Sequence, residues 1–266
     1  MIKALISLFG PRPQPDLPAV PRGERIYALG DIHGRLDLMV ALAEAVEADD
    51  RARGPADTTV ILLGDLVDRG PDSSGVIAAA RMWAQQRSLR FIIGNHEEMF
   101  LESFENIETL RHFLKYGGRE TLLSYAIDPV TYSAADLDEV QALMTAAVPK
   151  DDLDFLRSFE DSIVIGDYLF VHAGIHPGVA IADQSTSHMR WIREPFLSHA
   201  GDLGHVVVHG HTIMAEAEVL SNRIGIDTGA YNSGRLTVLG LEGTDRWLIE
   251  TRDDNGTITT ASRSAA

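Results

Sequence analysis

The chain has 266 residues, 45% of them hydrophobic, which is enough to bury the core of one large domain or two small ones. It contains no cysteine, which excludes disulfide frameworks and thiolate metal sites, and its formal net charge of -16 argues against nucleic acid and anionic membranes as partners. The apolar stretch 4–9 is too short to span a membrane and no cleavage site follows it, so we expect a cytoplasmic protein.

The first part of the chain predicts an arm followed by alternating strands and helices. Residues 1–22 are rich in proline and predict an extended arm. After the arm, apolar runs that end at glycine predict strands, and the segments between them have helical patterns. The expected strands are 25–29, 60–63 and 89–93, and the expected helices are 36–48 and 73–86. This order predicts an α/β sheet.

The middle of the chain is expected to be helical and the second half mostly β. Helical patterns cover 97–125 (interrupted at Gly117-Gly118), 134–148 and 151–159. We expect residues of about 105–160 to form a helical cap beside the site that shapes access to it. A hairpin (162–166 and 168–171) and a short helix (188–197) are then followed by short strands at 206–208, 217–220, 224–226, 236–241 and 247–250. No linker separates the halves. We therefore expect one domain, 23–252, with two packed sheets and a frayed polar tail, 253–266.

Polar residues that can bind metals follow five of the apolar strands. Asp31 and His33 are two positions apart, so on extended backbone both side chains point the same way. Each residue taken alone has an ordinary interpretation, for example a turn, or for Asn95 the N-cap of the next helix. Five strand ends of the same kind favour one shared metal site instead, because open α/β sheets place ligands there. The ligand candidates are Asp31, His33, Asp65, Asn95, His172 and His211.

These candidates offer nitrogen and oxygen donors without sulfur, a set that suits manganese, iron or zinc. They are numerous enough for two ions if one carboxylate bridges them, and two close metal ions can bind a phosphate and generate a hydroxide. Asp68 and Arg69, beside Asp65, add an orienting acid and a clamp for an oxyanion.

The motifs, taken in order, resemble the calcineurin-like metallophosphoesterases, and within them the bacterial and phage phosphoprotein phosphatases. The resemblance extends over about residues 23–240 and implies an α/β fold, a four-layer α-β-β-α sandwich of two mixed sheets. It also implies two divalent metal ions, foremost Mn²⁺, with Fe or Zn as alternatives. The matching segments are Gly30-Asp31-Ile32-His33-Gly34, Gly64-Asp65-Leu66-Val67-Asp68-Arg69-Gly70, Gly94-Asn95-His96-Glu97, His172-Ala173-Gly174 and Gly210-His211.

The resemblance implies a role for each site residue. One metal ion would be held by Asp31, His33 and Asp65, and the other by Asp65, Asn95, His172 and His211. His96 would protonate the leaving oxygen and Asp68 would orient it, while a metal-bound hydroxide attacks phosphorus. Arg69 and Arg193 would bind the phosphoryl oxygens, with Asn95 also facing the substrate. The role of His209, two residues before His211, stays open.

The expected function is metal-dependent hydrolysis of phosphomonoesters, with phosphoserine, phosphothreonine or phosphotyrosine proteins, or small phosphoesters, as substrates. One alternative is symmetrical hydrolysis of dinucleoside tetraphosphates, and Asp68 favours the phosphatase because the tetraphosphatase branch often lacks an acid there. A less favoured alternative is a phosphoprotein-binding module without catalysis. The segment from Gly117 to Tyr125 also resembles bacterial relatives, although a helix broken by glycines explains it equally well.

Overall fold

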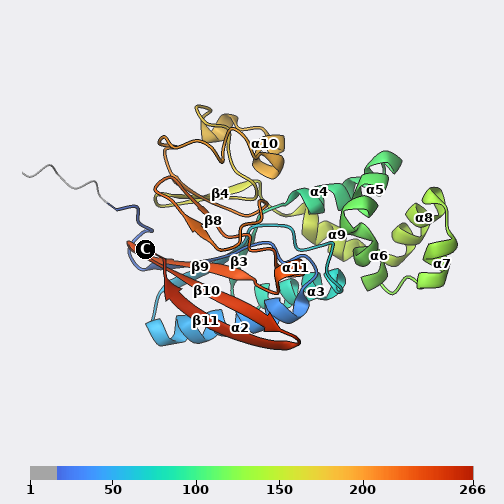
Figure 1. Cartoon of the computed structure of the whole chain (residues 1–266), viewed down its shortest axis with the longest axis horizontal. Helices are drawn as coiled ribbons and strands as arrows, with labels where there is room; N and C mark the ends of the chain where they lie inside the picture. The colour runs from blue at the N-terminus through green and yellow to red at the C-terminus, as the bar shows by residue number, and fades with distance from the viewer. Residues whose placement is uncertain (1–16, 266) are drawn as a thin grey trace, which may run out of the picture.

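Two mixed sheets lie face to face at the centre of the protein (Figure 1). The computed structural model describes residues 17–265, so residues 1–16 of the expected arm lie outside the described residues. The six-stranded sheet has the order β11 (Thr257–Ser264), β10 (Asp245–Asp254), β9 (Thr237–Glu242), β1 (Glu24–Leu29), β2 (Asp57–Leu62) and β3 (Ser88–Phe91). The five-stranded sheet has the order β4 (Ser162–Ile165), β5 (Tyr168–Val171), β6 (Val206–His209), β8 (Arg223–Gly225) and β7 (Glu218–Val219).

Parallel pairing brings the carboxyl ends of the central strands to one side. β1, β2 and β3 are parallel to one another, as are β5, β6 and β8. β9, β10 and β11 in the first sheet, and β4 and β7 in the second, pair antiparallel with their neighbours. The central strands are apolar on both faces because each sheet is covered on both sides. In β1, for example, Ile26 packs between the sheets, whereas Tyr27 packs under the helices on the other face.

Helices complete the four-layer order that the resemblance implied. α2 (Leu36–Arg53) and α3 (Ser73–Ala84) pack on the outer face of the six-stranded sheet. α10 (Thr186–Trp191) and its loops cover the five-stranded sheet through Met189, Ile192 and Phe196. Within residues 17–265, no helix combines the length and the apolar character that crossing a membrane requires.

A helical lobe projects beside the sheets (Figure 1). Its own core includes Phe100, Phe113, Leu122, Met144 and Leu156. The helical stretch expected over 97–125 is interrupted near Gly117, as expected, where the chain leaves helical geometry in a π-helical turn. It has one further break, because Asn106 caps a new helix. The lobe consists of α4 (Asn95–Glu102), α5 (Ile107–Phe113), the turn Leu114–Gly118, α6 (Arg119–Ser124), α7 (Pro129–Ala134), α8 (Leu137–Ala147) and α9 (Lys150–Arg157).

Both ends of the domain differ from the prediction. The tail 253–266 is not frayed over its described residues, because β10 continues to Asp254 and β11 pairs with it as a hairpin. The β-branched residues of 257–260 favour a strand, and its polar side chains are tolerated because β11 is an exposed edge. At the other end, packing starts before residue 23: Val20 is buried and its N–H donates to Gly243 O at 3.0 Å.

Candidate active site

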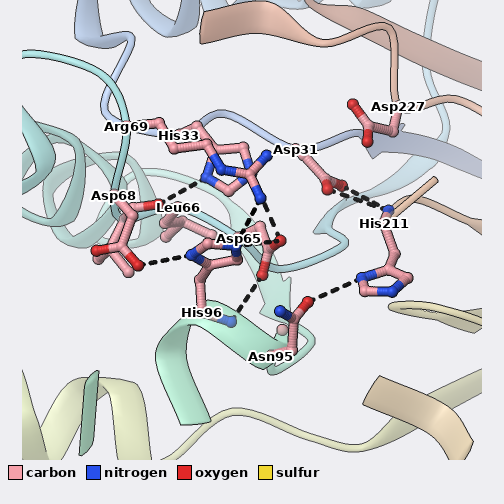
Figure 2. Close-up of polar contacts among 12 residues, drawn as sticks. Asp31, His33, Asp65, Leu66, Asp68, Arg69, Asn95, His96, His211 and Asp227 are labelled. Atoms are coloured by element: carbon pink, nitrogen blue, oxygen red, sulfur yellow. Dashed lines mark hydrogen bonds and ion pairs between the residues drawn. The ribbon is translucent and has the colours of Figure 1, made fainter. Parts of the chain in front are cut away.

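The predicted site residues lie together where the central strands end (Figure 2). Asp31 and His33 follow β1, Asp65 follows β2, and Asn95 opens α4 just after β3. His172 and His211 follow β5 and β6 of the other sheet. All six predicted metal ligands are buried. The structure thus brings together the side chains that the strand-end pattern selected, from both sheets.

One group of possible ligand atoms gathers around one carboxylate oxygen of Asp65, Oδ2. His33 Nδ1–H donates to Val67 O at 2.8 Å, which leaves His33 Nε2 facing Asp65 Oδ2 at 3.5 Å. Atoms of His33, Asp65 and His96 all lie within 4.8 Å of one another, a spacing that one cation could bridge. The hydrogen bond on the far nitrogen fixes the orientation of the His33 ring, as is usual for metal-binding histidines.

A second group of ligand atoms shares the same carboxylate. His172 Nδ1–H donates to Leu63 O at 2.8 Å, so His172 Nε2 faces Asp65 Oδ1 at 3.5 Å. The side-chain oxygen of Asn95 lies 2.9 Å from His172 Nε2 and 2.8 Å from His211 Nδ1. Asn95 is not the N-cap of α4; Gly94 is, and the amide of Asn95 points into the site. Asp65 therefore contributes to both groups.

Asp31 lies beside these groups and has an acidic neighbour that the sequence analysis missed. Its Oδ2 accepts the backbone N–H of His211 at 3.0 Å. Asp227 is also buried here, and its Oδ1 accepts the N–H of Gly229 at 2.9 Å (Figure 2). A signal was present, because Asp227 follows an apolar strand in the same way as Asp31 does.

The electrostatics of the site fit bound cations. Burial, then the charges of Asp227 and Asp65, raise the pKa of Asp31, and burial raises the pKa of Asp65 to about 6. Burial also lowers the pKa of His172 to about 4, so this ring is neutral and can donate a lone pair. A divalent cation would compensate the crowded carboxylates. The nitrogen and oxygen donors suit manganese, iron or zinc, so the residues present fit the predicted pair of ions.

The hydrogen-bonded side chains of His96 and Asp68, together with two arginines, lie near Asp65. His96 Nδ1–H donates to Asp68 Oδ2 at 2.6 Å, and Arg69 Nη2 lies 2.9 Å from His96 Nε2. The Arg69 guanidinium also lies over the ring of Tyr231, at 4.8 Å from its centroid. Arg193 is exposed and lines the same cavity of about 440 Å³, together with Asp65, Arg69, His96 and several residues of the helical lobe and α10.

The backbone is strained at the site. Five of the seven non-glycine residues with positive φ in the described chain are site residues, so strain is concentrated where the side chains converge. Their φ values lie between 47° and 74°. The residues are His33, Asp65, Asp68, Arg69 and His211. The sequence alone did not reveal this feature, because nothing in these residue types requires positive φ.

Glu97 supports the loop that carries Asp65. Its carboxylate accepts the backbone N–H groups of Asp65 at 2.8 Å, Leu66 at 2.7 Å and Gly94 at 2.9 Å, and it is fully buried. Glu97 belongs to the matching segment Gly94-Asn95-His96-Glu97, but this supporting role could not be predicted from the segment alone. His209, by contrast, lies outside both ligand groups: it packs on Phe196, and burial lowers its pKa to about 4.

Comparison with known proteins gives one family and relatives with different activities. A family model described as calcineurin-like phosphoesterase matches residues 24–234. The asymmetrical bis(5'-nucleosyl)-tetraphosphatase PrpE of Bacillus velezensis is 25% identical over 79% of this chain and 86% of its own. Serine/threonine-protein phosphatase 1 of Salmonella typhimurium is 24% identical over 82% and 92%. The cold-active protein-tyrosine phosphatase of a psychrophilic Shewanella shares the fold, with a TM-score of 0.55, 19% identity and coverage of 91% and 83%.

Proposed function

This chain belongs to the calcineurin-like phosphoesterase family, and we propose that it is a metal-dependent phosphomonoester hydrolase that acts on phosphoproteins. The observation that carries the proposal is the position of Asp65. This carboxylate belongs to two groups of ligand atoms and lies under the His96–Asp68 pair. An acid pair next to a site for two cations matches what phosphoryl transfer needs, namely charge neutralisation and a proton for the leaving oxygen.

In the proposal, one cation is held by Asp31, His33 and Asp65. The other is held by Asp65, Asn95, His172 and His211. When bound, the ions would neutralise charge on the phosphoryl group and activate the attacking water. Manganese as the natural ion, and a cytoplasmic location, remain predictions from the sequence.

His96 is proposed to be the general acid. In the free protein its Nε2 accepts a hydrogen bond from Arg69, so its proton is on Nδ1, toward Asp68. When Arg69 turns to the phosphoryl oxygens of a substrate, Nε2 becomes free to take up a second proton from solvent and to deliver that proton to the leaving oxygen. Asp68 stabilises the imidazolium that results, and exposed Arg193 adds a second contact to the phosphoryl group.

Hydrolysis of dinucleoside tetraphosphates is the second candidate. The name of the Bacillus velezensis relative favours it, since the match covers most of both chains. The cavity favours it as well, because exposed Tyr116 and Trp191 offer aromatic surface that a base could contact. The buried Asp68 beside His96 supports the phosphatase instead, because a monoester with a poor leaving group depends on an oriented acid.

The test compares three substrates on one preparation. Protein stripped by a chelator and then reloaded with Mn²⁺ is given a phosphoserine peptide, a phosphotyrosine peptide and diadenosine tetraphosphate. We expect activity on the peptides to vanish with chelation and to return with the metal. Hydrolysis of diadenosine tetraphosphate should be much slower than hydrolysis of the peptides. Faster turnover of the dinucleotide would show that the protein is a tetraphosphatase and not a phosphatase of phosphoproteins. Binding of the peptides without turnover of any substrate would leave only a binding module.

A further inference from the structure

We propose that Thr121, on helix α6 of the helical lobe, is a positioning residue for the Asp68–His96 pair. The inference rests on the proposed function and adds to it: the lobe does more than border the cavity, because it supplies part of the support for the acid. The segment Gly117–Tyr125 thereby gains a function that neither of its interpretations from the sequence contained.

The hydrogen bonds around Asp68 leave one consistent arrangement of protons. Asp68 Oδ2 is occupied by His96 Nδ1–H at 2.6 Å, and Thr121 Oγ1–H donates to Asp68 Oδ1 at 2.6 Å. The Asp68 N–H donates to Thr121 Oγ1 at 2.8 Å and to Ser73 Oγ at 3.0 Å. Because the Thr121 proton goes to the carboxylate, Ser73 must donate its own proton to Thr121, 2.9 Å away.

Thr121 therefore forms hydrogen bonds with Asp68 at two points, the backbone N–H and the carboxylate oxygen that His96 does not contact. Asp68, Thr121 and Ser73 are fully buried, so water does not compete for these hydrogen bonds. Asp68 also has a φ of 74°, a conformation that its surroundings must maintain. Removing the Thr121 hydroxyl would free the carboxylate to turn away from His96 and would leave Asp68 Oδ1 without its donor.

Contacts on both sides of Thr121 attach the lobe to the loop of Arg69 and to the first turn of α3. Before it, Gly117 O accepts the N–H of Arg69 at 3.1 Å. After it, Ser124 Oγ accepts the N–H of Ser74 at 3.0 Å, and Ser124 O accepts the Ser74 hydroxyl at 2.7 Å. These contacts place the Thr121 hydroxyl at Asp68 independently of its own hydrogen bonds. The lobe and the acid pair are thus one structural unit.

The experiment compares Thr121→Val, which removes the hydroxyl, with Thr121→Ser, which keeps it. A phosphoserine peptide, whose leaving group needs a proton, is assayed beside 4-nitrophenyl phosphate, whose leaving group needs it little. We expect Thr121→Val to lower kcat/KM for the peptide by about tenfold or more, the effect of losing a hydrogen bond to a charged group, with a much smaller loss for the nitrophenyl ester. Thr121→Ser should restore most of the activity on the peptide.

Two controls separate positioning from general damage. Thr145→Val removes a lobe hydroxyl that bonds only the backbone of its own helix and should change neither activity. In an Asp68→Asn background, Thr121→Val should lower kcat/KM for the peptide only slightly further, because the carboxylate that Thr121 positions is already absent. Equal losses on both esters, or full additivity with Asp68→Asn, would overturn the proposal. If the valine variant does not fold, Thr121→Ala takes its place in the same comparison.

The test also separates this inference from the proposed function. If wild-type protein hydrolyses neither ester, the proposed function fails, and the proton resonance of His96 Nδ1–H then becomes the readout. A shift of that resonance in Thr121→Val but not in Thr145→Val would still support positioning. An identical resonance in all three proteins would overturn it.

Discussion

At the scale of single residues, His96 is the side chain on which the proposed chemistry depends most. We expect His96→Asn to reduce kcat on a phosphoserine peptide by about 100-fold or more, the usual contribution of a general acid. The amount of bound metal should stay the same, because the proposed ligands are other side chains. Steady-state kinetics with metal analysis of the same sample check this. Unchanged turnover would remove the acid role from His96.

Glu97 should matter for stability. Its carboxylate accepts the N–H groups of the Asp65 loop, and a glutamine there would turn an amide N–H toward those donors. We expect Glu97→Gln to lower the free energy of unfolding by about 2–3 kcal/mol, measured by urea denaturation, because buried donors lose their partner. The matched control is Glu108→Gln, an exposed position at which we expect no measurable change.

Residue types and spacing predicted which side chains gather at the site, but not which other residues hold those side chains in position. The ligand candidates could be named because each follows an apolar strand, a local pattern. Thr121 could not be predicted as the partner of Asp68, because it is 53 positions away and contacts Asp68 only through the packing of the lobe. Asp227 was within reach of the same strand-end pattern and was overlooked.

At the scale of elements, the turn before α6 depends on a glycine. Gly117 has a φ of 111°, and a Cβ atom there would lie 2.7 Å from the backbone nitrogen of Arg69. We expect Gly117→Ala to destabilise the protein by about 1–3 kcal/mol and to lower activity, because the lobe must move away from Arg69. Thermal unfolding and peptide turnover check this. Full activity at wild-type stability would contradict a tight docking of the turn.

Elements were predictable where the pattern was strong and local. β1, β2 and β3 were found because apolar runs ended at glycine. The break inside 97–125 at Asn106, and the one inside 134–148 at Asp136, were missed because they depend on caps that a helical pattern hides. β11 was missed because its exposed, polar residues lack an apolar face, and only pairing with β10 makes them a strand.

At the scale of the whole molecule, a buried ion pair joins segments that are distant in sequence. Arg25 in β1 donates to Asp50 in α2 at 2.7 Å and to Glu242 in β9 at 2.9 Å. Burial raises the pKa of Asp50, but hydrogen bonds from Arg25 and Thr58 and the charge of Arg87 outweigh it, so the pKa lies below its ordinary value.

This depressed pKa predicts how the network depends on pH. The stabilisation is complete above the pKa of the unfolded chain, about 3.9, and is lost as the pH falls through the lower folded value. We expect Asp50→Asn to reduce the free energy of unfolding by about 2 kcal/mol at neutral pH and by much less near pH 3. Urea titrations of both proteins at the two pH values measure it. An equal difference at both would show that the charge of Asp50 contributes nothing.

The two ends of the described chain lie next to each other (Figure 1). Leu17 and Pro18 line one cavity of about 750 Å³ together with Ser264 and Ala265. A short linker could therefore join them, with new termini opened in the exposed loop 201–204, which precedes β6 at the end opposite His211. Such a circular permutant should fold with the side chains of the candidate site unmoved, because the order in which the segments are connected matters less to this architecture than the strand ends they bring together.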